Sequence, residues 1–172
     1  MFDQTPVLID AGVGTYTRQT FSNERYTIWT MQSNYHNLPT INGVPQKNGK
    51  QYKAQNIQVG KNRFSLDISK AYPEAAKVNR WIRSYEVKGT QAQIKDAFEL
   101  KEVVAPNVVN FLTWGDVDTS EAGKVTIRVK DVKAVLTYDA SRFDVSVETK
   151  VQDDTRLSNV WGKEIYRLSF TD

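Results

Sequence analysis

The residues best suited to chemistry are one aspartate and one histidine, each at the end of a structured stretch. Asp10 ends the apolar run 6–10 and precedes Gly12, and His36 is the only histidine among 172 residues. A carboxylate and a neutral imidazole are good zinc ligands, but a stable site needs at least three protein ligands. The pair predicts an incomplete zinc site. The alternative is that Asp10 caps the glycine turn and His36 makes an ordinary hydrogen bond.

Phenolic and amide side chains surround these two residues in the sequence. Tyr16, Tyr26 and Tyr35 are candidates for sugar contact or proton transfer, because a suitably placed phenol acts as acid or base. Packing within strands is the other explanation for all three tyrosines. Gln46 follows the turn signal Asn42-Gly43, and its position alone suits a surface turn residue.

The order of these residues forms a long pattern between residues 6 and 46. An apolar strand leads into Asp10-x-Gly12 and Tyr16, a second strand leads into Tyr35-His36-Asn37, and Asn42-Gly43-x-x-Gln46 follows. This pattern resembles the start of the C-terminal β-sandwich region in the heparinase II/III family of polysaccharide lyases. Its specific part is confined to these residues, although the later strands also look like that sandwich.

The resemblance implies a function, and it implies that the catalytic residues lie in another part of the enzyme. Family lyases cleave acidic polysaccharides that contain uronic acid, such as heparin and heparan sulfate, by β-elimination. It implies that Asp10 and His36 are two metal ligands, that the third ligand is a histidine before Met1, and that Gln46 supports His36. The principal catalytic residues then lie in a preceding α-helical toroid, so this chain contains no catalytic residue and is inactive alone. Tyr16 and Tyr35 become wall residues of the cleft.

Composition limits the other function classes. Hydrophobic residues make up 40% and charged residues 25%, which is ordinary for a globular domain. The chain has no cysteine, no run of 18 apolar residues and no signal-peptide pattern, so we expect neither thiolate chemistry nor a membrane span. No ladder of basic and aromatic residues indicates nucleic acid. Residues 51–101 carry 10 basic and 5 acidic residues, which suits either an acidic glycan or solvated strand edges.

Alternating side chains and frequent turns predict an all-β fold, an antiparallel two-sheet β-sandwich of the supersandwich type in a single domain spanning residues 1–172. Residues 70–78 are the one short helical candidate. Alternation predicts that Phe64, Leu66 and Ile68 share the buried face of a strand. The tryptophans at 81, 114 and 161 are expected to pack within strands. The further predicted strands cover residues 6–10, 26–31, 52–59, 81–89, 93–100, 107–114, 125–130, 132–138, 143–147 and 166–170.

Two functions from different classes follow. The first is the sandwich portion of a periplasmic or secreted lyase whose helical toroid is missing from this chain, with an unpaired edge at residues 2–10 that favours homodimer formation. The second is a non-catalytic carbohydrate-binding or structural β-sandwich module.

Overall fold

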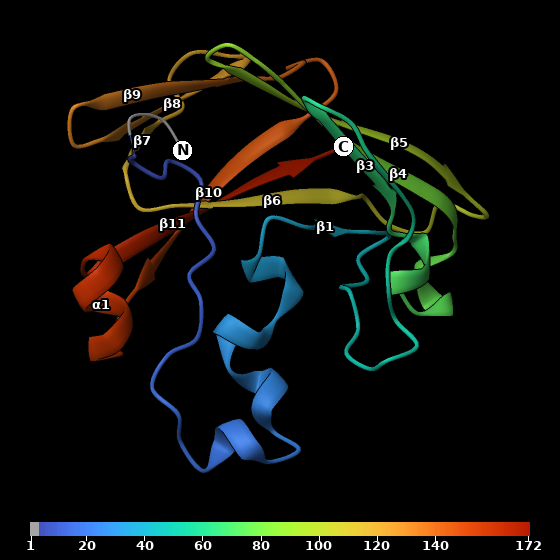
Figure 1. The fold of residues 1–172 in the computed structure, drawn as a ribbon, viewed down its shortest axis with the longest axis horizontal. Helices are drawn as coiled ribbons and strands as arrows, with labels where there is room; N and C mark the ends of the chain where they lie inside the picture. The colour runs from blue at the N-terminus through green and yellow to red at the C-terminus, as the bar shows by residue number, and fades with distance from the viewer. Residues whose placement is uncertain (1–3) are drawn as a thin grey trace. The chain divides into compact units, whose positions relative to one another are not determined.

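The computed structural model describes residues 4–172 and is predominantly β-structure (Figure 1). Eleven strands in three antiparallel sheets hold 44% of the residues, which confirms the predicted all-β class. The one α-helix in the described part of the chain is α1 (Thr155–Trp161). The chain divides into two compact units. The first contains the residues up to Pro39 together with Val108–Asp172, and the second is Thr40–Asn107.

The first unit is a two-layer sandwich. One layer is the sheet β1-β6-β11-β10 and the other is the sheet β7-β8-β9. Phe111 and Leu168 of the four-stranded sheet pack with Val125 and Ile127 of the three-stranded sheet in one buried cluster. The strands of these sheets are β1 (Pro39–Thr40), β6 (Val108–Thr113), β7 (Asp116–Asp118), β8 (Lys124–Val129), β9 (Val132–Thr137), β10 (Asp144–Val151) and β11 (Glu164–Thr171).

The opposite face of the four-stranded sheet positions the candidate site. Leu112 and Ile165 on this face pack against Ile9 and Ala11 of the N-terminal segment. Arg167 of β11 lies opposite Leu112 on one side and opposite Glu148 on the other. Because residues directly opposite each other share a face of the sheet, this second face collects both the apolar support and the charged groups of the site.

The second unit is a four-stranded antiparallel sheet of order β2-β3-β4-β5. Its buried cluster includes Ile41, Ile68, Tyr72 and Trp81. The strands are β2 (Gln55–Val59), β3 (Arg63–Asp67), β4 (Val78–Lys88) and β5 (Gln91–Leu100), and the 3-10 turns η5 (Ser69–Ala71) and η6 (Glu74–Ala76) lie between β3 and β4. The short helix predicted over residues 70–78 is therefore two separate turns, one on each side of Pro73.

The strand predicted at residues 26–31 is wrong. This segment belongs to four consecutive 3-10 turns, η1 (Gln19–Phe21), η2 (Arg25–Thr27), η3 (Trp29–Met31) and η4 (Ser33–Tyr35). The main-chain N–H of Thr27 donates to the Glu24 carbonyl at 2.9 Å, and the Thr27 hydroxyl donates to the same carbonyl at 2.7 Å. Threonine and serine side chains that bond to nearby main chain favour turns over strands, and this local bonding prevails over the alternating pattern.

The buried face predicted for residues 63–69 is also wrong within β3. Ser65 and Asp67 are buried, whereas Phe64 is 36% exposed. The cause is the Asp67 carboxylate, which accepts hydrogen bonds from the main-chain N–H groups of Ser69 at 2.9 Å and Trp81 at 3.4 Å. These bonds hold the polar side of the strand inward, and Ile68 is buried only after the strand has ended.

Trp161 lies at the end of α1 and not in a strand. The Asp154 carboxylate begins this helix by accepting hydrogen bonds from the main-chain N–H groups of Arg156 and Leu157, which is an ordinary N-cap. Gly162 ends the helix with φ +86°. The helix has seven residues, too few for a clear helical period in the sequence.

The strand predicted at residues 6–10 is an extended segment that forms few β-bridges. Leu8 forms an isolated bridge with Thr113, and the Ile9 N–H donates to the Leu112 carbonyl at 2.9 Å. This part of the predicted free edge at residues 2–10 is therefore paired with β6, and residues 2 and 3 lie outside the described residues. The homodimer stays a prediction.

Candidate functional site

Asp10 follows the segment that pairs with β6, at the point where the chain turns away from the sheet. Its Oδ1 accepts a hydrogen bond from the Gly12 N–H at 3.0 Å. Gly12 has φ +74°, a left-handed conformation that glycine adopts without strain. This short turn fixes the orientation of the carboxylate and leaves Oδ2 available for a second partner.

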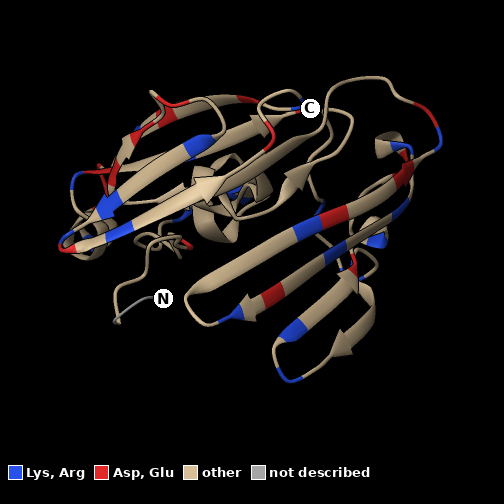
Figure 2. Ribbon diagram, turned by 90° about the horizontal axis from the view of Figure 1, so that it is seen from above, with Lys and Arg blue, Asp and Glu red and all other residues tan. Residues whose placement is uncertain are grey.

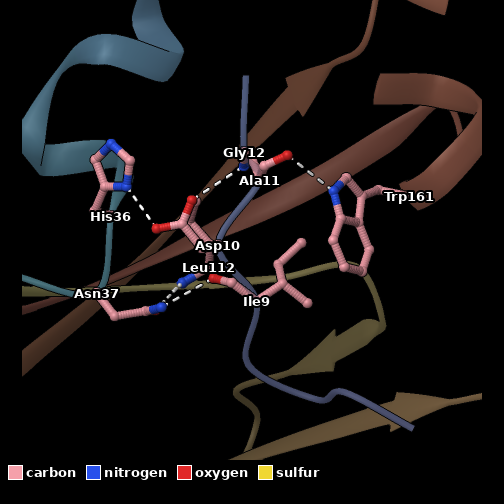
Figure 3. Close-up of polar contacts among 8 residues, drawn as sticks. All are labelled: Ile9, Asp10, Ala11, Gly12, His36, Asn37, Leu112 and Trp161. Carbon is pink, nitrogen blue, oxygen red and sulfur yellow. Dashed lines mark hydrogen bonds and ion pairs between the residues drawn. The ribbon is translucent and has the colours of Figure 1, made fainter. Parts of the chain in front are cut away.

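That second partner is His36, 26 residues further along the chain (Figure 3). The imidazole Nδ1 lies 2.7 Å from Asp10 Oδ2. His36 is the last residue of the turn that contains η4, and its main-chain N–H donates to the Ser33 carbonyl at 3.2 Å. The structure thus brings the two predicted metal ligands into direct contact within the first unit.

Asn37 holds this arrangement against the sheet. Its Nδ2 donates to the Ile9 carbonyl at 2.9 Å, and its Oδ1 accepts from the Leu112 N–H at 3.0 Å (Figure 3). One amide side chain therefore connects the segment carrying Asp10, the segment carrying His36 and strand β6. On the far side of Asp10, Trp161 Nε1 donates to the Ala11 carbonyl at 3.0 Å.

The contact shifts both ionisation equilibria in the direction of an ion pair. The hydrogen bond to His36 lowers the pKa of Asp10 from its ordinary 3.8, with a smaller contribution from the Gly12 N–H, although partial burial opposes the shift. The hydrogen bond to Asp10 raises the pKa of His36 above 6.5, and the Thr30 main-chain carbonyl adds to this rise against the desolvation. A protonated imidazole therefore satisfies both neighbours as a donor.

The donor types suit zinc, but the number of donors does not. Zinc bonds of about 2.0–2.2 Å at tetrahedral angles hold two donors about 3.3 Å apart, whereas Nδ1 and Oδ2 are 2.7 Å apart. Among residues 4–172, no cluster of three histidine, aspartate or glutamate side chains is placed to hold a metal ion. The pair fits a hydrogen bond as it stands and fits zinc only with a further ligand.

Tyr35, the residue before His36, belongs to a charged cluster on the same face of the sheet. Its hydroxyl donates to the Glu148 carboxylate at 3.0 Å, and Arg167 Nη2 lies 2.7 Å from that carboxylate. The Arg167 guanidinium lies 4.5 Å from the centre of the Tyr35 ring, and Lys150 Nζ lies 5.3 Å from it. Burial and the hydrogen bond to Glu148 raise the pKa of Tyr35, so the phenol stays protonated at neutral pH and donates this hydrogen bond.

Two further predicted site residues, Tyr16 and Tyr26, are largely exposed to solvent. Tyr16 is 59% exposed and contacts Phe21 edge-to-face with ring centres 5.7 Å apart. Tyr26, also a candidate for sugar contact, is 42% exposed. Gln46 lies in the second unit, and its support of His36 stays a prediction.

Sequence reasoning missed four residues that build the site: Asn37 as a connector, and Glu148, Lys150 and Arg167 from distant strands. The one available signal was the Asn37 position directly after His36, where an amide at a turn commonly bonds to main chain. For the other three, only the pairing of β10 with β11 reveals their proximity.

Comparisons with known proteins add no family to this geometry. The chain matches no known family profile, and a search of curated proteins finds no match. Within residues 4–172, no helix is long and apolar enough to cross a membrane.

Proposed function

We propose that this chain is the C-terminal β-sandwich portion of a heparinase II/III-like polysaccharide lyase acting on glycans that contain uronic acid. In this proposal, Asp10 and His36 contribute to a metal site, and the face around Tyr35 forms part of the cleft wall. The chain is inactive alone and works with an α-helical toroid. A periplasmic or secreted location belongs to the same proposal.

The observation that carries the proposal is the contact between Asp10 and His36. The pattern in the sequence required these side chains, 26 residues apart, to lie close together, and the 2.7 Å between His36 Nδ1 and Asp10 Oδ2 supports that convergence. Side chains of Asp10 and His36 on opposite faces of the sandwich would have ruled out the proposal. Asn37 adds weight, because an outer partner that fixes the two ligand-bearing segments is common around metal sites.

Charge also favours an acidic substrate. Residues 40–107, the second unit, hold twelve Lys and Arg and six Asp and Glu, a net charge of +6. Figure 2 shows blue Lys and Arg segments interspersed with red Asp and Glu segments along the strands. A positive unit attracts an anionic glycan over a distance of about 10 Å at moderate salt. In the first unit, Arg167 and Lys150 beside Tyr35 offer cations for a uronate carboxylate.

The chemistry expected of the complete enzyme is β-elimination. A base removes the proton alpha to the uronate carboxylate, and an acid protonates the departing glycosidic oxygen. Negative charge builds up on the carboxylate during proton removal, so cations near it lower the barrier. Arg167 is this chain's candidate for that stabilisation. The residues that move the protons are assigned by the proposal to the toroid.

Zinc titration calorimetry of residues 1–172 tests the metal part of the proposal. We expect weak binding that strengthens between roughly pH 6 and roughly pH 8, because His36 must lose its proton to coordinate. His36→Ala should abolish binding, and Asp10→Asn should weaken it by about tenfold or more. Adding a His-x-His segment before Met1 should tighten binding strongly.

A matched control is Asp139→Asn, because Asp139 also accepts a hydrogen bond from a main-chain N–H two residues later, Ser141, at 3.0 Å. The only histidine of the chain is elsewhere, so this variant should bind zinc as the parent does. Equal zinc binding by the parent and His36→Ala would overturn the metal assignment. So would an added histidine segment that leaves the affinity unchanged.

A further inference from the structure

Strand β5 forms a long edge of the sheet in the second unit. It lies at the end of the order β2-β3-β4-β5 and contains ten residues, Gln91–Leu100 (Figure 1). Eight of the ten are exposed, and only Asp96 and Leu100 are partly covered. The strand contains no proline. Natural sheet edges are commonly short, bulged or interrupted by proline, because a free edge accepts another strand.

The opposite edge of the same sheet, β2, has this kind of protection. It contains five residues, its register with β3 shifts between Gln55 and Gln58, and Asn56 has φ +52°. Such a bulge bends the strand and interrupts its row of main-chain groups. Because β5 is long and unbulged, it is the edge of this sheet that can accept another strand.

The hairpin turn before β5 determines which of its main-chain groups point outward. Lys88 of β4 lies opposite Gln91 across the two turn residues Gly89 and Thr90. Gly89 has φ +58°, as the first turn position of a type II′ hairpin requires. In such a hairpin the two residues that flank the turn form a hydrogen-bonded pair, and these pairs recur at every second residue. The odd-numbered residues of β5 therefore bond to β4.

The other side of β4 agrees with this alternation. The Val87 N–H donates to the Asn62 carbonyl at 2.9 Å, and the Trp81 carbonyl accepts from the Ile68 N–H at 2.9 Å. Odd-numbered residues of β4 thus bond away from β5, and even-numbered ones bond toward it. The main-chain N–H and C=O groups of the even-numbered residues within 92–100 consequently point to the free edge.

The charges on β5 favour a second copy of the same strand in one register. An antiparallel pair of identical strands is symmetric about one residue. Centring on Lys95 or Asp96 places like charges opposite each other, which is destabilising. Centring on Ala97 places Lys95 of each copy opposite Glu99 of the other, which forms two opposite-charge pairs. Centring one residue further along the chain opposes Lys95 to Lys101.

Main-chain geometry also suits the register centred on Ala97. The outward-pointing groups of residues 94, 96, 98 and 100 then meet their counterparts and exchange about eight hydrogen bonds. Ala97 lies on the symmetry axis in a pair without hydrogen bonds, where two Cα atoms approach to about 4.5 Å. Its small side chain fits this close approach.

The side chains on one face of β5 become covered in the same register. Ile94 is 37% exposed and Phe98 is 39% exposed. Ile94 meets Leu100 of the second copy, and Phe98 meets Asp96 of the second copy. The Asp96 carboxylate already accepts hydrogen bonds from Arg83 Nε at 2.8 Å and Nη2 at 2.5 Å, so its charge is compensated when an aromatic ring covers it.

We propose that two copies of this chain pair antiparallel through β5, centred on Ala97, and join their second units into one continuous eight-stranded sheet. The occupant of this edge is a second copy because the strand is complementary to itself in charge. This interface differs from the homodimer edge predicted at residues 2–10. It does not depend on the proposed lyase function, whose site residues lie in the first unit.

Sedimentation velocity of residues 1–172 over micromolar to near-millimolar concentrations tests the proposal. We expect a dimer whose fraction rises with concentration. Lys95→Glu and Glu99→Lys each turn both opposite-charge pairs into like-charge pairs, so each should weaken the dimer by about tenfold or more. An equimolar mixture of the two variants restores both opposite-charge pairs and should dimerise as the parent does. Lys61→Glu makes the same charge change in the exposed turn between β2 and β3 and should leave the dimer unchanged.

Hydrogen exchange followed by NMR locates the interface. With rising concentration, the amides of residues 94, 96, 98 and 100 should exchange more slowly, because their N–H groups become bonded. The amides of residues 93, 95 and 97 already bond to β4 and should change little. Neither charge variant should alter zinc binding at Asp10 and His36, so failure of this proposal and failure of the lyase proposal are distinguishable.

Several results would overturn the proposal. These are a chain that stays monomeric up to near-millimolar concentration, a dimer that Lys95→Glu leaves intact, or a mixture of the two variants that does not dimerise. A dimer that slows exchange at residues 4–10 and not in β5 would also overturn it. If Glu99→Lys fails to fold, Lys95→Glu decides the question alone, because Lys95 lies opposite the uncharged Ser84 on β4.

Discussion

Replacing Asp10 by asparagine perturbs the candidate site with the least structural damage. The asparagine Oδ1 can still accept the Gly12 hydrogen bond, so the turn is kept while the negative charge beside His36 is lost. The side chains of His36 and Asp10 are 30% and 56% exposed. Exposed ion pairs contribute about 0.2–1 kcal/mol, and hydrogen bonds to charged groups about 1.5–3 kcal/mol. We discount the second range for solvent screening and expect a coupling free energy of about 1 kcal/mol.

The pH dependence of this coupling follows from the two pKa shifts. The folded-state pKa of His36 is raised, so its contribution is fully present below pH 6.5 and is lost as the pH rises through the folded value. The folded-state pKa of Asp10 is lowered, so its contribution is present above pH 3.8 and is lost as the pH falls through the folded value. The coupling is therefore largest between these two ordinary pKa values.

Two assays measure the effect. Urea unfolding of the parent, Asp10→Asn, His36→Gln and the double variant gives the coupling free energy by a double-mutant cycle. NMR titration of the single imidazole gives the pKa of His36 directly, and this pKa should fall in Asp10→Asn but not in the matched variant Asp139→Asn. An unchanged pKa in Asp10→Asn, or a coupling free energy of zero near pH 5.5, would refute the reasoning from the contact.

Two further predictions concern the second unit. Asn42→Ala should lower the free energy of unfolding by about 3 kcal/mol or more, because the Asn42 side chain makes four hydrogen bonds to main-chain groups. Asn42→Gly should cost less than Asn42→Ala in the same urea experiment, because φ is +51°; equal costs would show that the backbone conformation contributes nothing. Arg83→Met should cost about 3–5 kcal/mol, because Arg83 is 1% exposed and its ion pair with Asp96 is broken. Arg83→Met with Asp96→Leu should recover most of this loss on thermal unfolding, and a double variant as unstable as the single one would contradict the account.

The sequence predicted the strands best where alternation and burial agree. In β8, Val125, Ile127 and Val129 alternate in the sequence and are all buried. The turn at Asn42-Gly43 was also predictable, because asparagine followed by glycine is a strong turn signal. In the structure both residues have positive φ, +51° and +73°, and Ile41 and Val44 bond across the turn. Local residue types determine these elements, so a single sequence was enough to predict them.

The errors come from places where side chains bond to the backbone or where distant segments meet. Thr27 satisfies a nearby carbonyl and converts an alternating stretch into 3-10 turns, and Asp67 reverses the expected faces of β3. The Asp10–His36 contact was predicted from a pattern of residues. The Glu148–Arg167 pair beside Tyr35 was not, because it depends on the register of two strands that are not adjacent to that pattern.

An elimination assay on the chain joined to a helical toroid tests the central claim most directly. The chain is extended at its N-terminus by the α-helical toroid of a heparinase II/III-like lyase and given heparan sulfate or another uronic-acid glycan, and the ultraviolet absorbance of the unsaturated uronate product is followed. The account predicts product from the extended chain, none from residues 1–172 alone, and a loss of activity in His36→Ala but not in Asp139→Asn. A folded extended chain that forms no product, or a His36→Ala variant as active as its parent, would contradict the account.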